Sequence, residues 1–292
     1  MKLKSRPAKI AFYLLKLILS AALLWIVFRK VDLALVLSSI LSLPPAILLL
    51  VFLLSAVRHF LQFNNWNWAL KLNPDYRVTP GQVFRTYMLG IPLRFILPGG
   101  NGSFAKVFFV DNSSKLATAV STLSEKAVMT WSIILFAAIG ALAYYAQYPL
   151  WLRIAAVFLI AETPHIALFV MKQVKAWQRF EPNAKKYGPH MLLAQIMAVL
   201  ITLLQYWLLL NCLHSISFKQ IVIRISLTQF SNIIPITISG LGLRESFAMH
   251  FLNGTGISAG QAVTATLSLF VLQDLIPAVI GTMFFWKRGV KR

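Results

Sequence analysis

Six long apolar runs divide this chain, and they decide what it can fold into. They are Ile10–Phe28, Pro44–Phe63, Leu116–Tyr144, Leu150–Met171, Met191–Leu213 and Ile257–Trp286. About 20 apolar residues in a helix cross the roughly 30 Å hydrocarbon core of a bilayer. Because 58% of the 292 residues are hydrophobic and only 12% are charged, a soluble core could not bury them. The sequence therefore predicts a polytopic all-α membrane protein with one transmembrane domain, residues 1–292.

The net charge of +20 comes from 28 Lys and Arg against 8 Asp and Glu. In a soluble protein this balance indicates nucleic-acid binding. Here the basic residues lie between the apolar runs and at both ends, as the positive-inside rule describes. We therefore expect no nucleic-acid partner, a membrane lipid surface as the partner, and both termini in the cytoplasm.

Two further segments are too short for two full crossings and are broken by Pro and Gly. They are Thr79–Val110 and Lys219–Leu252. The distribution of basic residues requires each segment to begin and end on the same side of the membrane. We therefore predict two re-entrant hairpins of half-helices, the first entering from the cytoplasm and the second from outside. Such backbone is tolerated at membrane depth only when buried in protein or facing a wet cavity.

The order of spans and hairpins indicates an inverted repeat. Residues 1–144 read span, span, hairpin, span, and residues 150–292 repeat that order from the opposite side. Three spans in each half reverse the orientation of the second half, a known transporter design. The sequence echo is weaker, a Pro, a Gly-x-Gly and a basic residue in each hairpin: Pro98, Gly100, Gly102 and Lys106, against Pro235, Gly240, Gly242 and Arg244.

Charged residues inside or beside the apolar runs are the candidate site residues. Asp274 lies in the last run, Arg244 and Glu245 follow the second break, and Glu125 and Lys126 lie in the third run. A charge at the bilayer centre costs at least about 2.5–3.5 kcal/mol, so such groups usually face an interior cavity or pair there. Two interpretations stay open, a polar cavity for ions or head groups and a set of structural ion pairs.

The Gly-rich breaks are the second candidate feature. Half-helix N-termini after Gly100, Asn101 and Gly102, and after Gly240 and Gly242, would offer free N–H groups to a phosphate. Cationic side chains nearby would add to the attraction: Arg94, Lys106 and Arg244. The plain alternative is a turn that lets helices pack closely.

The sequence contains no motif for hydrolysis, nucleotide binding or metal binding. The single cysteine, Cys212, excludes an internal disulfide and a cysteine zinc site. We expect no cofactor, no metal and no catalytic residue. An intramembrane lipid enzyme is disfavoured for lack of a nucleophile–base pair.

Two blocks resemble a known family. One runs from Ile233 to Glu245 (Ile-Ile-Pro-Ile-Thr-Ile-Ser-Gly-Leu-Gly-Leu-Arg-Glu), and the other from Ile96 to Lys106 (Ile-Leu-Pro-Gly-Gly-Asn-Gly-Ser-Phe-Ala-Lys). Together they resemble the lysylphosphatidylglycerol synthase transmembrane region, or flippase-like domain. This chain departs from the family pattern in having Asn101 and Ser103 near the Gly pair and Glu125-Lys126 in the third run.

The resemblance implies a flippase-like protein of a prokaryotic-type inner (cell) membrane. It would translocate an anionic, aminoacylated or polyprenyl-phosphate-linked lipid. The alternative, from another class, is a non-transporting membrane partner of a lipid- or glycan-modifying enzyme. The lipid, the energy source and the oligomeric state stay open at this point.

Overall fold

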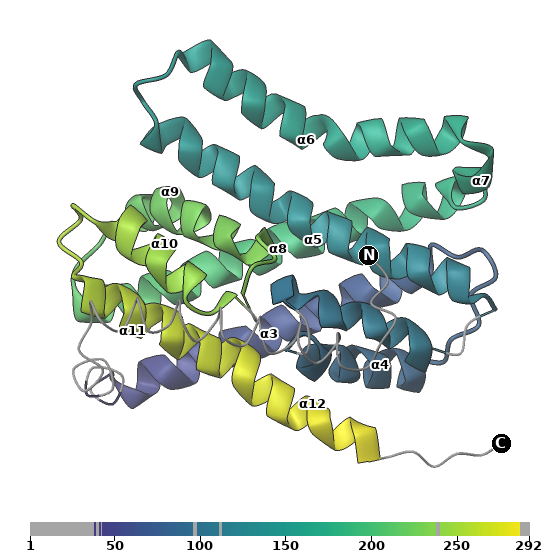
Figure 1. Cartoon of the computed structure of the whole chain (residues 1–292), viewed down its shortest axis with the longest axis horizontal. Coiled ribbons are helices and arrows are strands. Elements are labelled where there is room, and N and C mark those ends of the chain that lie inside the picture. Colours follow the sequence, from purple (N-terminus) through teal and green to yellow (C-terminus); the bar gives the residue numbers. More distant parts are fainter. Residues whose placement is uncertain are drawn as a thin grey trace, which may run out of the picture.

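The computed structural model describes residues 38, 41, 43–95, 98–110, 113–237 and 240–286, without the side chains of 98–103 and 285–286. The described chain is all-helical (Figure 1). Its elements are α3 (Pro45–Leu70), α4 (Pro80–Leu93), η1 (Pro98–Phe109), α5 (Lys115–Tyr144), α6 (Leu150–Gln173), α7 (Lys175–Gln178), α8 (Glu181–Leu213), α9 (Phe218–Gln229), η2 (Phe230–Ile233), α10 (Leu243–Leu252), α11 (Ala259–Phe270), η4 (Val271–Leu275) and α12 (Ile276–Trp286).

Within the described residues, five helical stretches are long and apolar enough to cross a membrane. They are α3, α5, α6, α8 and the continuous stretch Ala259–Phe284, which joins α11, η4 and α12. The all-helical membrane fold predicted from the sequence is thus confirmed for these five predicted spans. The sixth predicted span, Ile10–Phe28, lies outside the described residues.

Two predicted span boundaries are wrong, and packing explains both. The second span does not end at Phe63, because α3 continues to Leu70 and buries Asn65 and Trp66 completely. The fifth span does not begin at Met191, because α8 starts at Glu181. In both places the sequence turns polar, which predicts a helix end. The helix nevertheless continues, because it packs against other parts of the protein.

Each broken segment folds as two short helices that pack against each other. In the first, α4 packs on η1, and in the second, α9 packs on α10, with non-helical residues at 234–237 between them in the chain. Ser217 caps α9 by accepting from the Gln220 amide, and Thr79 caps α4 in the same way through Gln82. The re-entrant position of these pairs in a bilayer stays a prediction.

The two parts of the chain pack on each other reciprocally. Helix α5 packs on α9, and α12 packs on α4, so the last helix of each part covers the first short helix of the other. Likewise η1 packs on α5 and α10 packs on α11, while α3 packs on α8. Such an exchange of equivalent contacts is expected of an internal repeat, although the inverted halves 1–144 and 150–292 stay a prediction.

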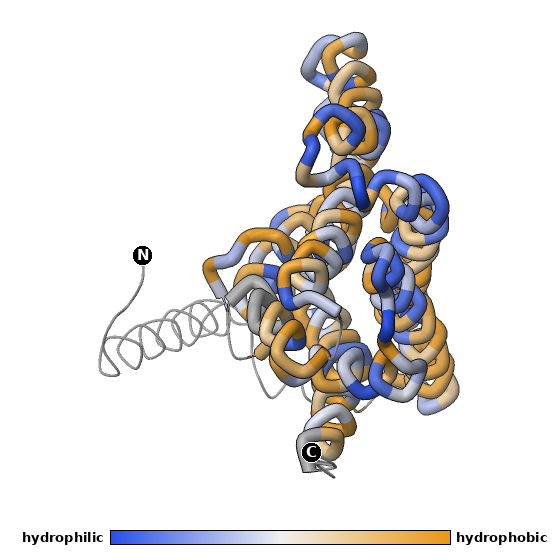
Figure 2. The backbone as a smooth tube through the Cα atoms, turned by 90° about the vertical axis from the view of Figure 1, so that its right-hand side faces the viewer, coloured by the Kyte–Doolittle hydropathy of each residue, from blue (hydrophilic) through white to orange (hydrophobic). Residues whose placement is uncertain are grey.

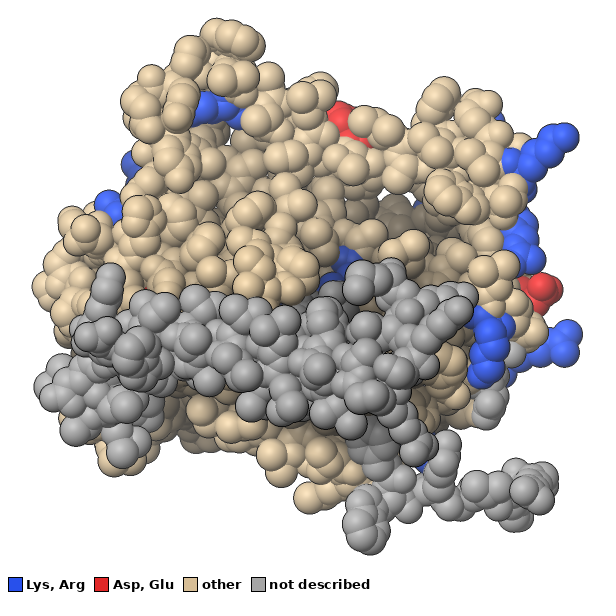
Figure 3. Space-filling view, viewed as in Figure 1, with Lys and Arg blue, Asp and Glu red and all other residues tan. Residues whose placement is uncertain are grey.

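One helix stands apart from the bundle. Helix α6 has no buried residue and lies along α5, forming with α7 the arm at the top of Figure 1. Lys and Arg gather at the end of the molecule that carries α7 (Figure 3), and Figure 2, which looks at that end, shows hydrophilic segments among the helix ends. Apolar segments dominate elsewhere.

Two glycines set the closest helix contacts, and their replacement should destabilise the protein. A Cβ on Gly140 would lie 2.5 Å from the Ile223 carbonyl oxygen, and one on Gly281 would lie 2.5 Å from that of Met88. We expect Gly140→Ala and Gly281→Ala each to cost about 1–3 kcal/mol of stability through overpacking. Thermal unfolding in detergent measures this. Gly188→Ala is the matched control, because no heavy atom lies within 4 Å of its added Cβ. Equal melting temperatures for all three variants would contradict the close approach.

Candidate functional site

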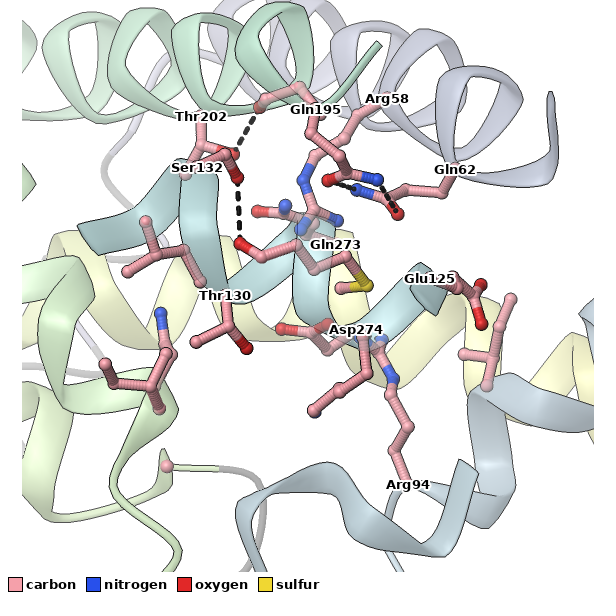
Figure 4. A pocket seen from close by; sticks show the side chains of 18 of the residues that line it. Arg58, Gln62, Arg94, Glu125, Thr130, Ser132, Gln195, Thr202, Gln273 and Asp274 are labelled. Carbon is pink, nitrogen blue, oxygen red and sulfur yellow. Dashed lines mark hydrogen bonds and ion pairs between the residues drawn. The ribbon is translucent and has the colours of Figure 1, made fainter. Parts of the chain in front are cut away.

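A polar cavity of about 400 Å³ lies inside the apolar bundle, between the two broken segments (Figure 4). Its walls come from α3, α4, η1, α5, α8, α9, η2, α10, α11 and η4. Its charged lining residues are Arg58, Arg94, Lys106, Lys126 and Arg244, with the carboxylates Glu125 and Asp274. Five cations against two carboxylates make this an anion-attracting site.

Asp274 joins the two broken segments electrostatically. Its Oδ1 accepts a hydrogen bond from Arg94 Nη2 at 2.9 Å, and its Oδ2 lies 3.9 Å from Arg244 Nη1. Arg94 caps the end of α4, and Arg244 lies in the first turn of α10. Figure 4 shows Arg94 and Asp274 pointing toward each other. A single carboxylate therefore holds one guanidinium from each segment.

Asp274 occupies a turn of π-helix. The residues Val271–Leu275 form η4, which interrupts the helical stretch between α11 and α12. A π-turn inserts an extra residue and frees backbone groups from regular pairing, and such turns are frequent at functional sites. Here the Gln273 carbonyl oxygen accepts from His59 Nε2 at 2.9 Å. Because Tyr87 OH lies 2.7 Å from His59 Nδ1, the neutral Nε2–H tautomer satisfies both bonds.

The second Gly-rich break places Arg244 by backbone geometry. Gly240 and Gly242 have φ of +78° and +83°, a region that favours glycine. The turn starts α10 at Leu243, and Glu245 Oε2 accepts from the Gly242 amide at 2.6 Å. Glu245 Oε1 lies 3.3 Å from Arg244 Nη2, and its side chain is fully buried. The break thus fixes Arg244 against Glu245 at the cavity wall, with its guanidinium 5.3 Å from the Phe270 ring centre.

The first segment supplies an equivalent ion pair. Lys106 of η1 donates to Glu125 of α5, and the two residues are 4% and 7% exposed. The Lys106 ammonium also lies 3.7 Å from the Trp66 ring centre, a cation–π contact. Trp66 is fixed in turn by its Nε1, which donates to Thr86 Oγ1 at 3.0 Å. Both sides of the ammonium are therefore engaged by the protein.

The structure gathers most predicted site residues at this one cavity. Arg94, Lys106, Glu125, Lys126, Gly240, Arg244 and Asp274 line it, and Gly242 and Glu245 lie directly behind Arg244. Gly100, Asn101 and Gly102 belong to η1, whose first half has no described side chains. The predicted phosphate site at their helix N-terminus therefore stays a prediction.

Sequence analysis missed a cation, Arg58 of α3. With the Gln273 amide turned so that its oxygen faces α3, that oxygen accepts from Arg58 Nη1 at 2.7 Å and from Nε at 2.5 Å. The cavity also holds a reciprocal amide pair, Gln62 and Gln195, with both N–O distances at 3.0 Å. The signal is present in the sequence, since Arg58 interrupts the apolar run Pro44–Phe63.

The arrangement has the chemistry to bind a phosphate group. Arginine matches phosphate oxygens with two parallel hydrogen bonds. Neutral donors and acceptors complete the lining, with Thr130, Ser132 and Thr202 on the walls. Among the described residues, no group of three His, Cys, Asp or Glu could hold a metal ion.

The family of the lysylphosphatidylglycerol synthase TM region matches residues 13–281. The chain belongs to this family. The match spans both broken segments and every residue that lines the cavity. Comparisons with curated proteins and with solved structures give no match. For this member of the lysylphosphatidylglycerol synthase transmembrane family, the membrane-lipid context comes from the family, and the site comes from the structure.

Proposed function

We propose that the protein moves a phosphate-bearing lipid head group between membrane leaflets through the central cavity. The observation that carries this proposal is an excess of cations in a cavity enclosed by an otherwise apolar bundle. A head group cannot cross the hydrocarbon core without such a polar path. The protein acts without covalent chemistry, and anionic, aminoacylated and polyprenyl-phosphate-linked lipids are the candidate classes.

In this proposal, the ion pairs at Asp274 are the contacts that break and re-form during transport. Arg244 and Arg94 share Asp274 in the structure, and a lipid phosphate can replace the carboxylate at one guanidinium without leaving a bare buried charge. Exchange between carboxylate and phosphate would open and close the contact between the two broken segments. The lipid phosphate would thus pass from the arginine of one broken segment to the arginine of the other.

Reconstitution tests the proposed function. Vesicles containing the purified chain and a panel of fluorescent phospholipids should show protein-dependent access of the inner-leaflet label to an impermeant quencher. The panel includes anionic, aminoacylated and polyprenyl-phosphate lipids, and protein-free vesicles give the baseline. If the protein increased quencher access to the inner-leaflet label for none of these lipids, the proposed transport function would be wrong.

We further propose a cell-membrane location with both termini and the α7 end in the cytoplasm. In a Cys212-free background, cysteines placed in 145–149 and 253–256 should react with an impermeant reagent from outside. Cysteines in 172–187 should react only after the membrane is opened. Labelling of 145–149 and 253–256 from opposite sides would mean that the second broken segment spans the membrane, which contradicts the inverted repeat.

A non-transporting role as a partner of a lipid- or glycan-modifying enzyme is the second candidate. The observation that favours it is α6, whose apolar surface is left uncovered by the described residues. Near the middle of this helix, Glu162 Oε2 lies 2.9 Å from His165 Nδ1 on an exposed face. Polar groups at membrane depth usually face protein, so this face suits a neighbouring membrane helix. This second candidate would be supported if an enzyme co-purified with the protein and the protein itself showed no translocation activity.

A further inference from the structure

The charge balance of the cavity decides among the lipid classes. We infer that the site takes a lipid with a terminal, doubly charged phosphoryl group and excludes an aminoacylated, cationic head group. This inference rests on the proposed function for its biological meaning, but it concerns binding alone. Its source lipid can be a glycerolipid such as phosphatidate or a polyprenyl phosphate, which share this terminal group.

The first step is the balance of charges. Among the described residues, the cavity lining carries three more cations than carboxylates. Counting the buried Glu245 behind Arg244 leaves an excess of two. A phosphomonoester carries about −1.5 to −2 at pH 7, so it neutralises this excess. A phosphodiester carries a single charge and leaves part of the excess uncompensated.

The second step is the engagement of the carboxylates. Glu125 accepts from Lys106, Asp274 accepts from Arg94, and Glu245 accepts from both Arg244 and the Gly242 amide. A lysyl head group would bring two ammonium groups into the cavity, and each would need a carboxylate. Taking one would strip a buried cation of its partner, which is strongly unfavourable.

The third step is Arg58. The structure places no described carboxylate within 4.0 Å of its guanidinium, which is held by the neutral Gln273 amide. Asp274 is shared between two other arginines. Arg58 therefore has no direct ion pair with a described carboxylate, and a bound phosphate would supply an anion in contact with its guanidinium.

Equilibrium binding to the purified full chain tests this inference. Titration by native mass spectrometry would use phosphatidate, a polyprenyl phosphate, phosphatidylglycerol and lysyl-phosphatidylglycerol of matched chains where possible. We expect the two terminal phosphates to bind about tenfold or more tightly than phosphatidylglycerol, and lysyl-phosphatidylglycerol to bind most weakly. If the protein prefers phosphatidate or the polyprenyl phosphate, the preferred lipid identifies the source of the phosphate. If the two bind equally, recognition rests on the phosphoryl group. Lysyl-phosphatidylglycerol binding as tightly as phosphatidate would overturn the inference.

Variants tie the selectivity to the cavity. Arg58→Gln should weaken terminal-phosphate binding about ten- to hundredfold and narrow the difference from phosphatidylglycerol. Arg58→Lys, which keeps the charge, should keep the order of preference and serves if the first variant folds poorly. Lys185→Gln is the control, since this exposed residue pairs with Glu181 outside the cavity. An unchanged ratio between the affinities for terminal phosphates and for phosphatidylglycerol in correctly folded Arg58→Gln would also overturn the inference.

Binding separates this inference from the proposed function. A chain that binds terminal phosphates but moves no lipid keeps the inference and loses the transport function. A chain that moves lysyl-phosphatidylglycerol keeps the transport function and loses the inference.

Discussion

Replacing Arg244 by alanine should abolish lipid movement while the protein still inserts into the membrane. The guanidinium is 5% exposed, lines the cavity and faces both Glu245 and Asp274. Its loss removes a bidentate phosphate donor, which Lys cannot fully replace. We therefore expect Arg244→Lys to keep only part of the activity. Asp274→Asn should impair movement more than folding. Without the carboxylate, Arg94 and Arg244 would have no aspartate to exchange for the lipid phosphate, so they would release the phosphate less readily.

Parallel measurements distinguish this role from a structural ion pair. The vesicle translocation rate and the melting temperature in detergent are taken for each variant. In our account the translocation rate of Arg244→Lys falls much further than its loss of stability would explain. The charge-swapped pair, Arg244→Asp with Asp274→Arg, should not restore movement, because the new Arg would face Arg94, which lies 2.9 Å from Asp274. Recovery of both rate and stability by the swap would contradict lipid binding by Arg244.

Breaking the Lys106–Glu125 pair should cause the largest loss of stability. Both side chains are more than nine-tenths buried, and they join η1 to α5. Glu125→Gln leaves a buried ammonium without its carboxylate, a change that typically costs about 3–5 kcal/mol. We expect a large drop in melting temperature and in the amount of protein in the membrane fraction.

The double variant Lys106→Met with Glu125→Leu assigns the role of the pair. Replacing a buried ion pair by apolar residues of similar size is often neutral for stability, and it leaves the charge excess of the cavity unchanged. Because Trp66 and Glu125 already engage both sides of the ammonium, we expect stability and translocation both to recover. Recovered stability without translocation would place Lys106 in contact with the lipid.

Local apolar patterning predicts much of this fold. The five described spans and both broken segments were predictable because runs of about 20 apolar residues and clusters of Pro and Gly are local signals. The ends of α3 and α8 were not. Asn65 and Trp66 follow the apolar run Pro44–Phe63 in the sequence, yet both are fully buried, and Trp66 bonds to Thr86 of α4. Burial against a distant partner leaves no local trace.

The candidate site shows the same division. Asp274, Arg244 and Glu125 stand out as charges in or beside apolar runs, and the structure brings them to one cavity. Their pairing could not be read from the sequence. Arg94, which closes α4, is the nearest partner of Asp274, although the two residues lie 180 positions apart in the sequence. The π-turn that carries Asp274 also has no sequence signature.

The central claim is that a lipid phosphate occupies the cavity, and the position of a bound lipid tests it most directly. The measurement is an experimental structure of the full chain in lipid nanodiscs containing a terminal-phosphate lipid. We predict phosphate density inside the cavity, within hydrogen-bond distance of at least one of Arg58, Arg94 and Arg244. Lipid density confined to the outer surface, with Arg94 and Arg244 still bound to Asp274 and no density between them, would contradict the account.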